Sequence, residues 1–269
     1  MSRMAQCFQR LNNDNKKALI PYIVAGDPQK DLTVSVMHEM VSNGADIIEL
    51  GIPFSDPEAE GPVIQLAHER SLVHGTSLID TCHMVGEFRK LNKLTPVLLM
   101  GYINPIEKMG YEKFALLAVK SGVDALLIVN LPPEEGKELD EVLLANNIDR
   151  ICLVAPTTTD SRAKFLCQES RGFVYYVSLK GTTGAATINM DEVEERVTKL
   201  KAFCKLPMVV GFGIKDGTSA AKVATFADGS VVGTAIVDIF ESQQKSPEKI
   251  APAVGKLIAS MREAMDNVA

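Results

Sequence analysis

The chain contains no hydrophobic run that approaches the roughly 18 to 20 apolar residues needed to cross a bilayer. Its first fifteen residues are rich in polar side chains and lack the apolar centre of a signal peptide. Lys and Arg number 28 against 34 Asp and Glu, so the net charge is −6, with no long run of either sign. We therefore expect a cytoplasmic protein with no membrane and no nucleic-acid partner.

Several chemical motifs are also missing. The cysteines are odd in number and widely spread, without a C-x-x-C pair, so we expect buried, reduced thiols at Cys7, Cys82, Cys152, Cys167 and Cys204. His68 and His74 are six residues apart, which is not the H-E-x-x-H spacing, and we expect no metal. Without a G-x-S-x-G elbow or a Cys–His pairing, nothing supports nucleophilic catalysis.

Short β-branched apolar runs alternate with segments of helical period along the whole chain. The expected strands are residues 18–24, 46–50, 96–100, 125–129, 151–155, 174–178, 208–211 and 230–233. The expected helices include residues 32–43, 111–121, 134–146, 162–169, 190–203 and 219–227. Runs such as ALLIV are apolar at consecutive positions, which is typical of parallel strands covered on both faces.

Eight such units in about 250 residues favour an α/β fold, a single (β/α)8 TIM barrel over residues 1–269. A doubly wound open sheet is the alternative, although it usually has fewer strands. Met4, Phe8 and Leu11 recur at helical spacing, which predicts an extra N-terminal helix covering the barrel floor. No low-complexity tract or linker divides the chain.

In a barrel of this class the active site lies at the carboxyl ends of the strands. Glu49 interrupts the second apolar run and faces opposite to Ile48 and Leu50, so one of these two sets points into the barrel. Inside the barrel a carboxyl group would have a raised pKa and would suit a general acid. The alternative places Glu49 against an outer helix, paired with Lys or Arg. Taken singly, Asp56, Glu58 and Glu60 are expected to be solvated loop residues.

Small residues follow the last three expected strands, at residues 178–186, 211–217 and 231–236. Glycines there allow backbone N–H groups and helix N-termini to approach an anion, and barrels often hold a phosphate after strands 7 and 8. The sequence therefore predicts a small phosphorylated substrate. The GFGIKDG segment does not match G-x-G-x-x-G, which excludes a dinucleotide fingerprint there.

The motifs resemble those of the alpha subunit of tryptophan synthase. They are PYIVAGDP (21–28), ELGIPFSDPEAEGPVIQ (49–65), GYINP (101–105), KGTTGA (180–185) and GFGI (211–214), in the same order over nearly the whole chain. The resemblance implies a barrel that cleaves indole-3-glycerol phosphate to indole and glyceraldehyde 3-phosphate by a retro-aldol step. It implies no cofactor in this chain.

The resemblance assigns Glu49 as general acid and base, and Glu60 as the second carboxylate, which holds the indole N–H. It places Tyr175 near the glycerol phosphate. Phosphate would be bound by Gly184, Gly213, Gly233 and Thr234, and the indole pocket would be lined by Tyr22, Ile64, Met100, Tyr102, Leu127 and Phe212. Thr183 would link the loops at residues 53–62 and 179–187 when they close over substrate.

Members of this family pair with a beta subunit that uses pyridoxal phosphate (PLP), as an alpha2beta2 heterotetramer. The contact side would include Pro53, Phe54, Asp56, Pro57, Asn104 and Pro132. Among these, we expect the two loop prolines and Phe54 to form an exposed apolar edge.

Three positions depart from the family pattern. Glu60 replaces the usual Asp, Leu179 stands where many members have Arg, and Asn130 stands where Asp often occurs. One alternative is a weakly active subunit that serves mainly to bind and activate a beta chain. A further alternative is an isomerase or epimerase of sugar phosphates, but the sequence places no metal ligands or strand lysine for it.

Overall fold

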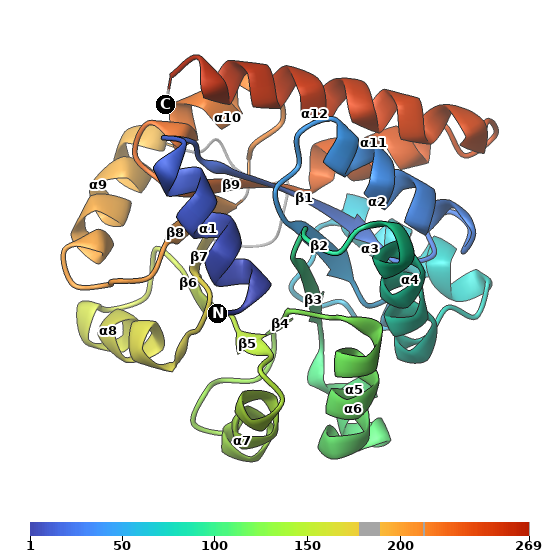
Figure 1. Ribbon diagram of the computed structural model, residues 1–269, viewed down its shortest axis with the longest axis horizontal. Coiled ribbons are helices and arrows are strands. Elements are labelled where there is room, and N and C mark those ends of the chain that lie inside the picture. Colours follow the sequence, from blue (N-terminus) through green and yellow to red (C-terminus); the bar gives the residue numbers. More distant parts are fainter. Residues whose placement is uncertain (178–188, 212, 269) are drawn as a thin grey trace.

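A ring of parallel strands forms the centre of the chain, with helices around it (Figure 1). The computed structural model describes residues 1–177, 189–211 and 213–268. Its strands are β1 (Ala18–Val24), β2 (Ile48–Gly51), β3 (Val97–Gly101), β4 (Ala125–Ile128), β5 (Asp149–Arg150), β6 (Cys152–Val154), β7 (Val174–Val177), β8 (Met208–Gly211) and β9 (Gly229–Val232). They are hydrogen-bonded in the order β5-β4-β3-β2-β1-β9-β8-β7-β6.

The two short strands β5 and β6 together occupy one of the eight strand positions of the barrel. Only Ile151 separates them, and its N–H donates to the Leu126 carbonyl at 2.9 Å. Because β5 pairs with β4 and β6 pairs with β7, this position closes the ring. The expected TIM barrel is confirmed. The fifth strand was expected as one run over 151–155 but is split in two and begins at Asp149, because its two halves pair with different neighbours.

Helices follow the strands and form the outer layer. They are α1 (Arg3–Asn13), α2 (Leu32–Ser42), α3 (Pro62–Val73), α4 (Leu78–Leu91), α5 (Ile103–Met109), α6 (Tyr111–Ser121), α7 (Lys137–Ala145), α8 (Asp160–Glu169), α9 (Met190–Lys201), α10 (Gly217–Ala224), α11 (Thr234–Ser242) and α12 (Ile250–Asp266). The expected helical segments are all present, with ends shifted by less than one turn. No helix among the described residues is long and apolar enough to cross a membrane.

Alternate residues of each strand divide into an inner and an outer hydrophobic cluster. Leu50 and Leu99 pack outward against the helices, whereas Tyr22 and Leu98 belong to the inner cluster. Glu49 is paired laterally with Tyr22 on one side and with Leu98 on the other. Laterally paired residues share a face of the sheet, so Glu49 points into the barrel.

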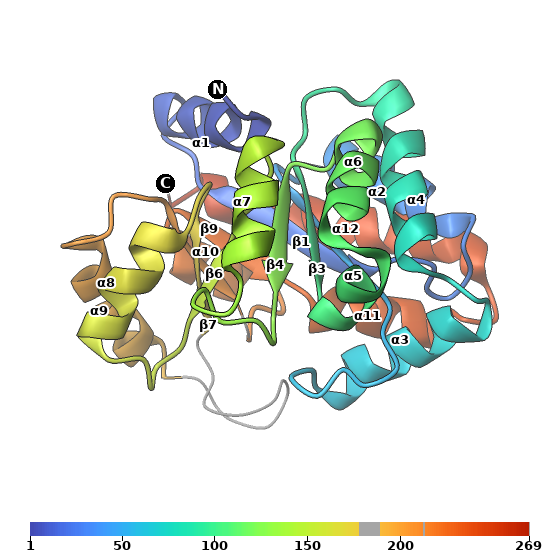
Figure 2. The same ribbon diagram turned by 90° about the horizontal axis from the view of Figure 1, so that it is seen from below.

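The N-terminal helix closes the amino end of the barrel. Met4 and Leu11 are buried in the inner cluster, and the Phe8 ring lies 5.9 Å from that of Phe173. Arg3 is paired with Asp124 at 2.7 Å, directly before β4. Figure 2 shows α1 at one end of the barrel and α3 at the other. The expected floor helix is therefore present, and the carboxyl ends of the strands lie opposite it.

Candidate active site

Glu49 on β2 is a buried carboxyl group with one unpaired oxygen atom. Its side chain is 1% exposed, and Oε1 has no hydrogen-bond partner among the described residues. Burial, and next the charge of Glu60, raise the pKa of Glu49 to about 8. A buried polar atom without a partner destabilises the fold, so its presence in a protein points to a functional role. The carboxyl group therefore holds its proton at neutral pH and faces the interior in a form that can donate it.

Glu60 is the second buried carboxyl group of the site. It is 5% exposed, and burial raises its pKa to about 7. The expectation of a solvated loop residue, formed from Glu60 taken singly, is wrong, although Asp56 and Glu58 are exposed as expected. Glu60 stands directly before Gly61, the N-cap of α3, so the start of that helix fixes the position of its backbone.

Tyr102, at the end of β3, holds the loop that carries Glu60. The Ala59 N–H donates to its hydroxyl at 3.1 Å, and its ring stacks on Phe54 with 5.1 Å between centroids. The Gln65 amide donates to the Glu60 carbonyl at 2.9 Å. These contacts fix the backbone on both sides of Glu60, which limits the directions its side chain can take.

Three side chains of α3 fasten this helix to the carboxyl end of β1. His68 Nε2 lies 3.4 Å from the Tyr22 hydroxyl, and the Ser71 hydroxyl donates to the Ala25 carbonyl at 2.5 Å. Arg70 makes a bidentate pair with Asp27, at 2.6 and 2.8 Å. The helix that begins beside Glu60 is thus held rigidly against the strand that carries Tyr22.

His68 also determines how Tyr22 is hydrogen-bonded. Its Nδ1 accepts the Phe54 N–H at 3.0 Å, and burial lowers its pKa to about 4, so the ring is neutral. The proton of the neutral ring therefore sits on Nε2 and is donated to Tyr22 Oη. Sequence reasoning missed this role because it considered His68 only as a zinc ligand with His74; the signal was a histidine inside a motif that otherwise carries carboxyl groups.

Two tyrosines share the site with the carboxyl groups. The pKa values of Tyr22 and Tyr175 are raised by burial and then by the charges of both glutamates. A Cβ atom at Gly51 would lie 2.4 Å from Tyr22 Oη, and one at Gly211 would lie 2.2 Å from Tyr175 Oη. Glycines at the ends of β2 and β8 therefore make room for the two hydroxyl groups.

An apolar wall adjoins these polar groups. Ile64 and Leu127 are buried in the same inner cluster as both tyrosines, Met100 is partly buried against it, and Tyr102 is 1% exposed. Phe212, the remaining residue expected in the indole pocket, lies outside the described residues. The structure thus brings the described members of this set to the carboxyl end of the barrel.

The expected phosphate residues occupy the ends of the last two strands. Gly213 follows β8 with φ at +73°, a conformation that favours glycine, and it is exposed. Gly233 caps α11 and Thr234 is its first residue, so free backbone N–H groups of a helix start are available here. Thr183, Gly184 and Leu179 lie outside the described residues.

The residues expected to face a partner differ in exposure. Asp56, Asn104 and Pro132 are exposed, and the Asn130 amide donates to Asn104 Oδ1 at 3.4 Å. The expected exposed apolar edge is wrong in part: Pro53 is buried, and Phe54 and Pro57 are half-buried. The reason is that Phe54 stacks on Tyr102 and draws the start of the loop against the barrel.

Asn130, which follows β4, connects two neighbouring segments at the carboxyl end of the barrel. Its Oδ1 accepts the Ile103 N–H at 2.9 Å, which joins the end of β4 to the start of α5. An aspartate could accept the same N–H, so this contact between the end of β4 and the start of α5 is kept when Asn replaces Asp.

Among the described residues, no group of three or more His, Cys, Asp or Glu is placed to hold a metal ion.

Fold and site together define a class. A parallel barrel with two buried carboxyl groups of raised pKa at the carboxyl ends of its strands is a barrel built for general acid–base chemistry. An apolar wall and a glycine-rich strand end beside these groups suit a substrate with a flat apolar part and an anionic part.

Comparison with known proteins identifies the family. The family described as "Tryptophan synthase alpha chain" matches residues 8–266. The tryptophan synthase alpha chains of Nitrosococcus oceani and Thioalkalivibrio sulfidiphilus are 52% and 53% identical over 266 residues, covering 99% of this chain and 98% and 100% of theirs. The crystal structure of tryptophan synthase subunit alpha from Legionella pneumophila superimposes with a TM-score of 0.94 at 46% identity, covering 100% of both chains.

The chain belongs to the tryptophan synthase alpha chain family. This membership gives it a lyase activity, the alpha reaction, in tryptophan biosynthesis. The class inferred from the carboxyl groups and the class of the family therefore agree.

Proposed function

We propose that this chain cleaves indole-3-glycerol phosphate to indole and glyceraldehyde 3-phosphate, with Glu49 and Glu60 as the catalytic residues. One observation carries the proposal: Glu49 is buried inside the barrel and its Oε1 has no partner among the described residues, and burial raises the pKa of this group to about 8. The substrate is the partner that this group lacks. No metal or organic cofactor is needed for the steps below.

Glu49 acts twice in the proposed retro-aldol reaction. It first donates its proton to the indole ring carbon that bears the glycerol side chain, which leaves positive charge on the ring nitrogen. As carboxylate it then accepts the proton of the adjacent side-chain hydroxyl. The carbon–carbon bond breaks, its electron pair restores the indole ring, and the hydroxyl carbon becomes the aldehyde. The proton count balances, and a pKa of about 8 lets one group serve in both directions near neutral pH.

Glu60 stabilises the charge that forms on the ring. As a carboxylate it accepts the indole N–H, and this hydrogen bond strengthens as the nitrogen becomes positive. Its pKa of about 7 leaves it largely ionised at a pH where Glu49 still holds its proton. Because the two carboxyl groups interact, they titrate as a pair, with a single shared proton between about pH 7 and 8.

The remaining substrate contacts are assigned by position. The indole ring would lie against Tyr22, Ile64, Met100, Tyr102, Leu127 and Phe212. The phosphate would be bound by backbone N–H groups at Gly213, Gly233 and the start of α11, beside Tyr175. Gly184 and Thr183, which lie outside the described residues, would also contribute. The helix start supports this placement because its partial positive charge favours an anion.

We further propose that the chain, as one domain in the cytoplasm, associates with a PLP-dependent beta subunit in an alpha2beta2 heterotetramer. The free thiols support a reducing compartment. The contact side would be the carboxyl end of the barrel, where Asp56, Asn104 and Pro132 are exposed. Indole is apolar, so direct transfer to the partner would keep it from escaping. PLP would be bound by the partner alone.

Indole release from indole-3-glycerol phosphate, measured with and without a beta subunit, tests the proposal. We expect the isolated chain to release indole at a measurable rate and the beta subunit to raise that rate. Indole release only in the presence of the beta subunit would favour the alternative of an activating partner. No release under either condition would contradict the assignment of Glu49 and Glu60.

A further inference from the structure

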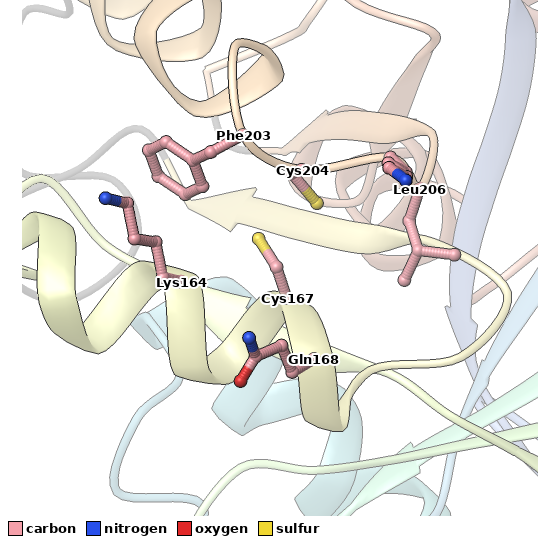
Figure 3. A pocket seen from close by; sticks show the side chains of 7 residues that line it. Lys164, Cys167, Gln168, Phe203, Cys204 and Leu206 are labelled. Carbon is pink, nitrogen blue, oxygen red and sulfur yellow. The ribbon is translucent and has the colours of Figure 1, made fainter.

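A surface pocket of about 360 Å³ lies away from the carboxyl groups of the site, between α8 and the segment that joins α9 to β8. Lys164, Cys167 and Gln168 line it from α8, and Phe203, Cys204, Lys205 and Leu206 line it from the connecting segment. Figure 3 shows the sulfur atoms of Cys167 and Cys204 pointing toward each other across the pocket. Cys167 lies in the last turn of α8, which precedes β7, and Cys204 lies in the segment that enters β8 at its amino end.

The two thiols are the cysteines that line this pocket. Cys167 is half-buried, which corrects the expectation that all thiols are buried. Cys204 is buried, with 7% of its surface exposed, but it lines the pocket. Cys7, Cys82 and Cys152 are also buried but do not line this pocket, and burial raises their pKa values to about 12, 12 and 11. Thiols of that kind are inert, because the thiolate is the reactive form.

The Cys167 thiol donates a hydrogen bond to the Cys204 sulfur. This bond lowers the pKa of Cys204 and raises that of Cys167. The backbone at Leu206 further favours the Cys204 thiolate, whereas burial and the Asp228 carboxylate oppose it. The neighbouring Cys152 raises the pKa of Cys167. In this arrangement the Cys204 thiol ionises more readily than the Cys167 thiol.

The charged side chains that line the pocket are two lysines. Lys164 and Lys205 line it and are exposed, and Lys164 Nζ lies 5.4 Å from the centre of the Phe203 ring. Gln168 adds an uncharged polar group. An incoming reagent with carboxylates would therefore be attracted to the pocket, and a cationic one would be repelled.

We propose that Cys204 and Cys167 form a dithiol modification site that reacts with anionic low-molecular-weight disulfides and closes to an intramolecular disulfide. The Cys204 thiolate attacks one sulfur of the reagent; a protein–reagent disulfide forms and one reagent thiolate leaves. The Cys167 sulfur, after passing its proton to that thiolate, attacks Cys204, and the second reagent thiolate leaves. The protein dithiol is oxidised by two electrons and the reagent disulfide is reduced to two thiols.

The geometry favours the second step. The two sulfur atoms lie in hydrogen-bond contact and point toward each other (Figure 3), so the second step begins with its reacting atoms close together. The bond would tie α8 to the segment that enters β8 at its amino end, and the catalytic carboxyl groups lie at the opposite end of the barrel. The site is thus independent of the proposed alpha reaction.

The test treats the native chain with glutathione disulfide, which carries carboxylates, and maps the products by intact mass and peptide mass spectrometry. We expect loss of the mass of two hydrogen atoms and a peptide cross-linked between Cys167 and Cys204. Cystamine, a cationic disulfide, serves as the comparison. The rate of each disulfide with the protein is divided by its rate with a free small thiol, which corrects for its intrinsic reactivity. After this correction, cystamine should react at least severalfold more slowly than glutathione disulfide. A chain whose cysteines all stay reduced, or a cross-link between other cysteines, would overturn the proposal. Equal corrected rates for the two disulfides would show that the site does not prefer anionic reagents.

Variants separate the two roles. Cys204→Ser should react about tenfold or more slowly than the wild type, because the thiol that ionises more readily is absent. Cys167→Ser should retain glutathione on Cys204, because no resolving thiol is present. Cys82→Ala is the matched control and should react like the wild type. The assignment of the two roles would be overturned if Cys204→Ser consumed glutathione disulfide at the wild-type rate. It would also be overturned if Cys167→Ser carried no glutathione on Cys204. The wild-type cross-link map tests the site even where a variant fails to fold.

Discussion

Tyr22 and His68 meet in the wall of the barrel, with 3.4 Å between the phenol oxygen and Nε2. This contact joins the strand next to Glu49 to the helix that begins beside Glu60. The other nitrogen of His68 accepts the Phe54 N–H at 3.0 Å, so a single neutral ring connects the strand, the helix and the loop. His68 is therefore a positioning residue for both carboxyl groups.

Replacing His68 by Ala should lower kcat for indole release by about tenfold or more, because small displacements of catalytic groups are costly. It should also lower the free energy of unfolding by about 1 to 3 kcal/mol, since buried hydrogen bonds are lost. His74→Ala, on the exposed end of the same helix, is the control. Equal kcat values for the two variants would show that His68 only stabilises the fold. The substitution His68→Asn, which keeps one acceptor for Phe54, should restore part of the activity.

The position of Glu60 in place of the usual aspartate leads to a second prediction. Glu60→Ala should reduce indole production by about 10² or more, because the ring nitrogen loses the group that stabilises its charge. Glu60→Asp should stay within about tenfold of the wild type, since a loop that closes on substrate can absorb one methylene of displacement. Glu58→Ala, exposed in the same loop, should be nearly neutral. Normal turnover of Glu60→Ala in the isolated chain would remove Glu60 from the mechanism.

Stability as a function of pH tests the state of Glu49 without substrate. Its pKa rises from 4.5 when unfolded to about 8 when folded, so the folded chain holds the proton more tightly. The stability contributed by the protonated group is fully present below pH 4.5 and is lost as the pH rises through 8. Glu49→Gln keeps a neutral side chain and should escape this loss. Its free energy of unfolding, relative to the wild type, should increase by a few kcal/mol between about pH 4.5 and 8. Denaturant unfolding at several pH values measures the difference, and a constant difference would mean that the pKa is not raised.

Association with a beta subunit can be tested at Pro132, which is exposed after β4. Pro132→Arg should weaken the complex at least about tenfold, because a long charged side chain would have to be desolvated in the contact. Asn12→Arg, exposed on α1 at the opposite end of the barrel, should leave binding unchanged. Sedimentation velocity at micromolar concentrations provides the measurement. Equal weakening by both variants, or by neither, would place the contact elsewhere.

The barrel could be predicted from the sequence because its signals are local. Consecutive apolar runs such as ALLIV indicate buried parallel strands, and the spacing of these runs along the chain indicates how many strands the barrel has. The facing of Glu49 could only be narrowed to two choices, because alternation along a strand does not say which face is inside. The lateral pairing with Tyr22 and Leu98 resolves it, and pairing between distant segments is not local information.

The loop after β2 shows where sequence reasoning stops. Its prolines and Phe54 indicated an exposed edge, but Tyr102 from another strand stacks on Phe54 and draws the segment inward. Glu60 and Glu58 look alike in the sequence, yet only Glu60 is buried, because α3 begins directly after it. The link between His68 and Tyr22 likewise depends on contacts across 46 residues of sequence.

Indole release by Glu49→Gln tests the central claim most directly. The amide keeps the size of the side chain but can neither donate nor accept the proton, and this residue is required to do both. We predict folding comparable to the wild type by circular dichroism and a loss in kcat near the upper end of the range of about 10² to 10⁴ that one acid–base group typically contributes. Turnover within tenfold of the wild type would show that Glu49 is a structural residue and would contradict the mechanism.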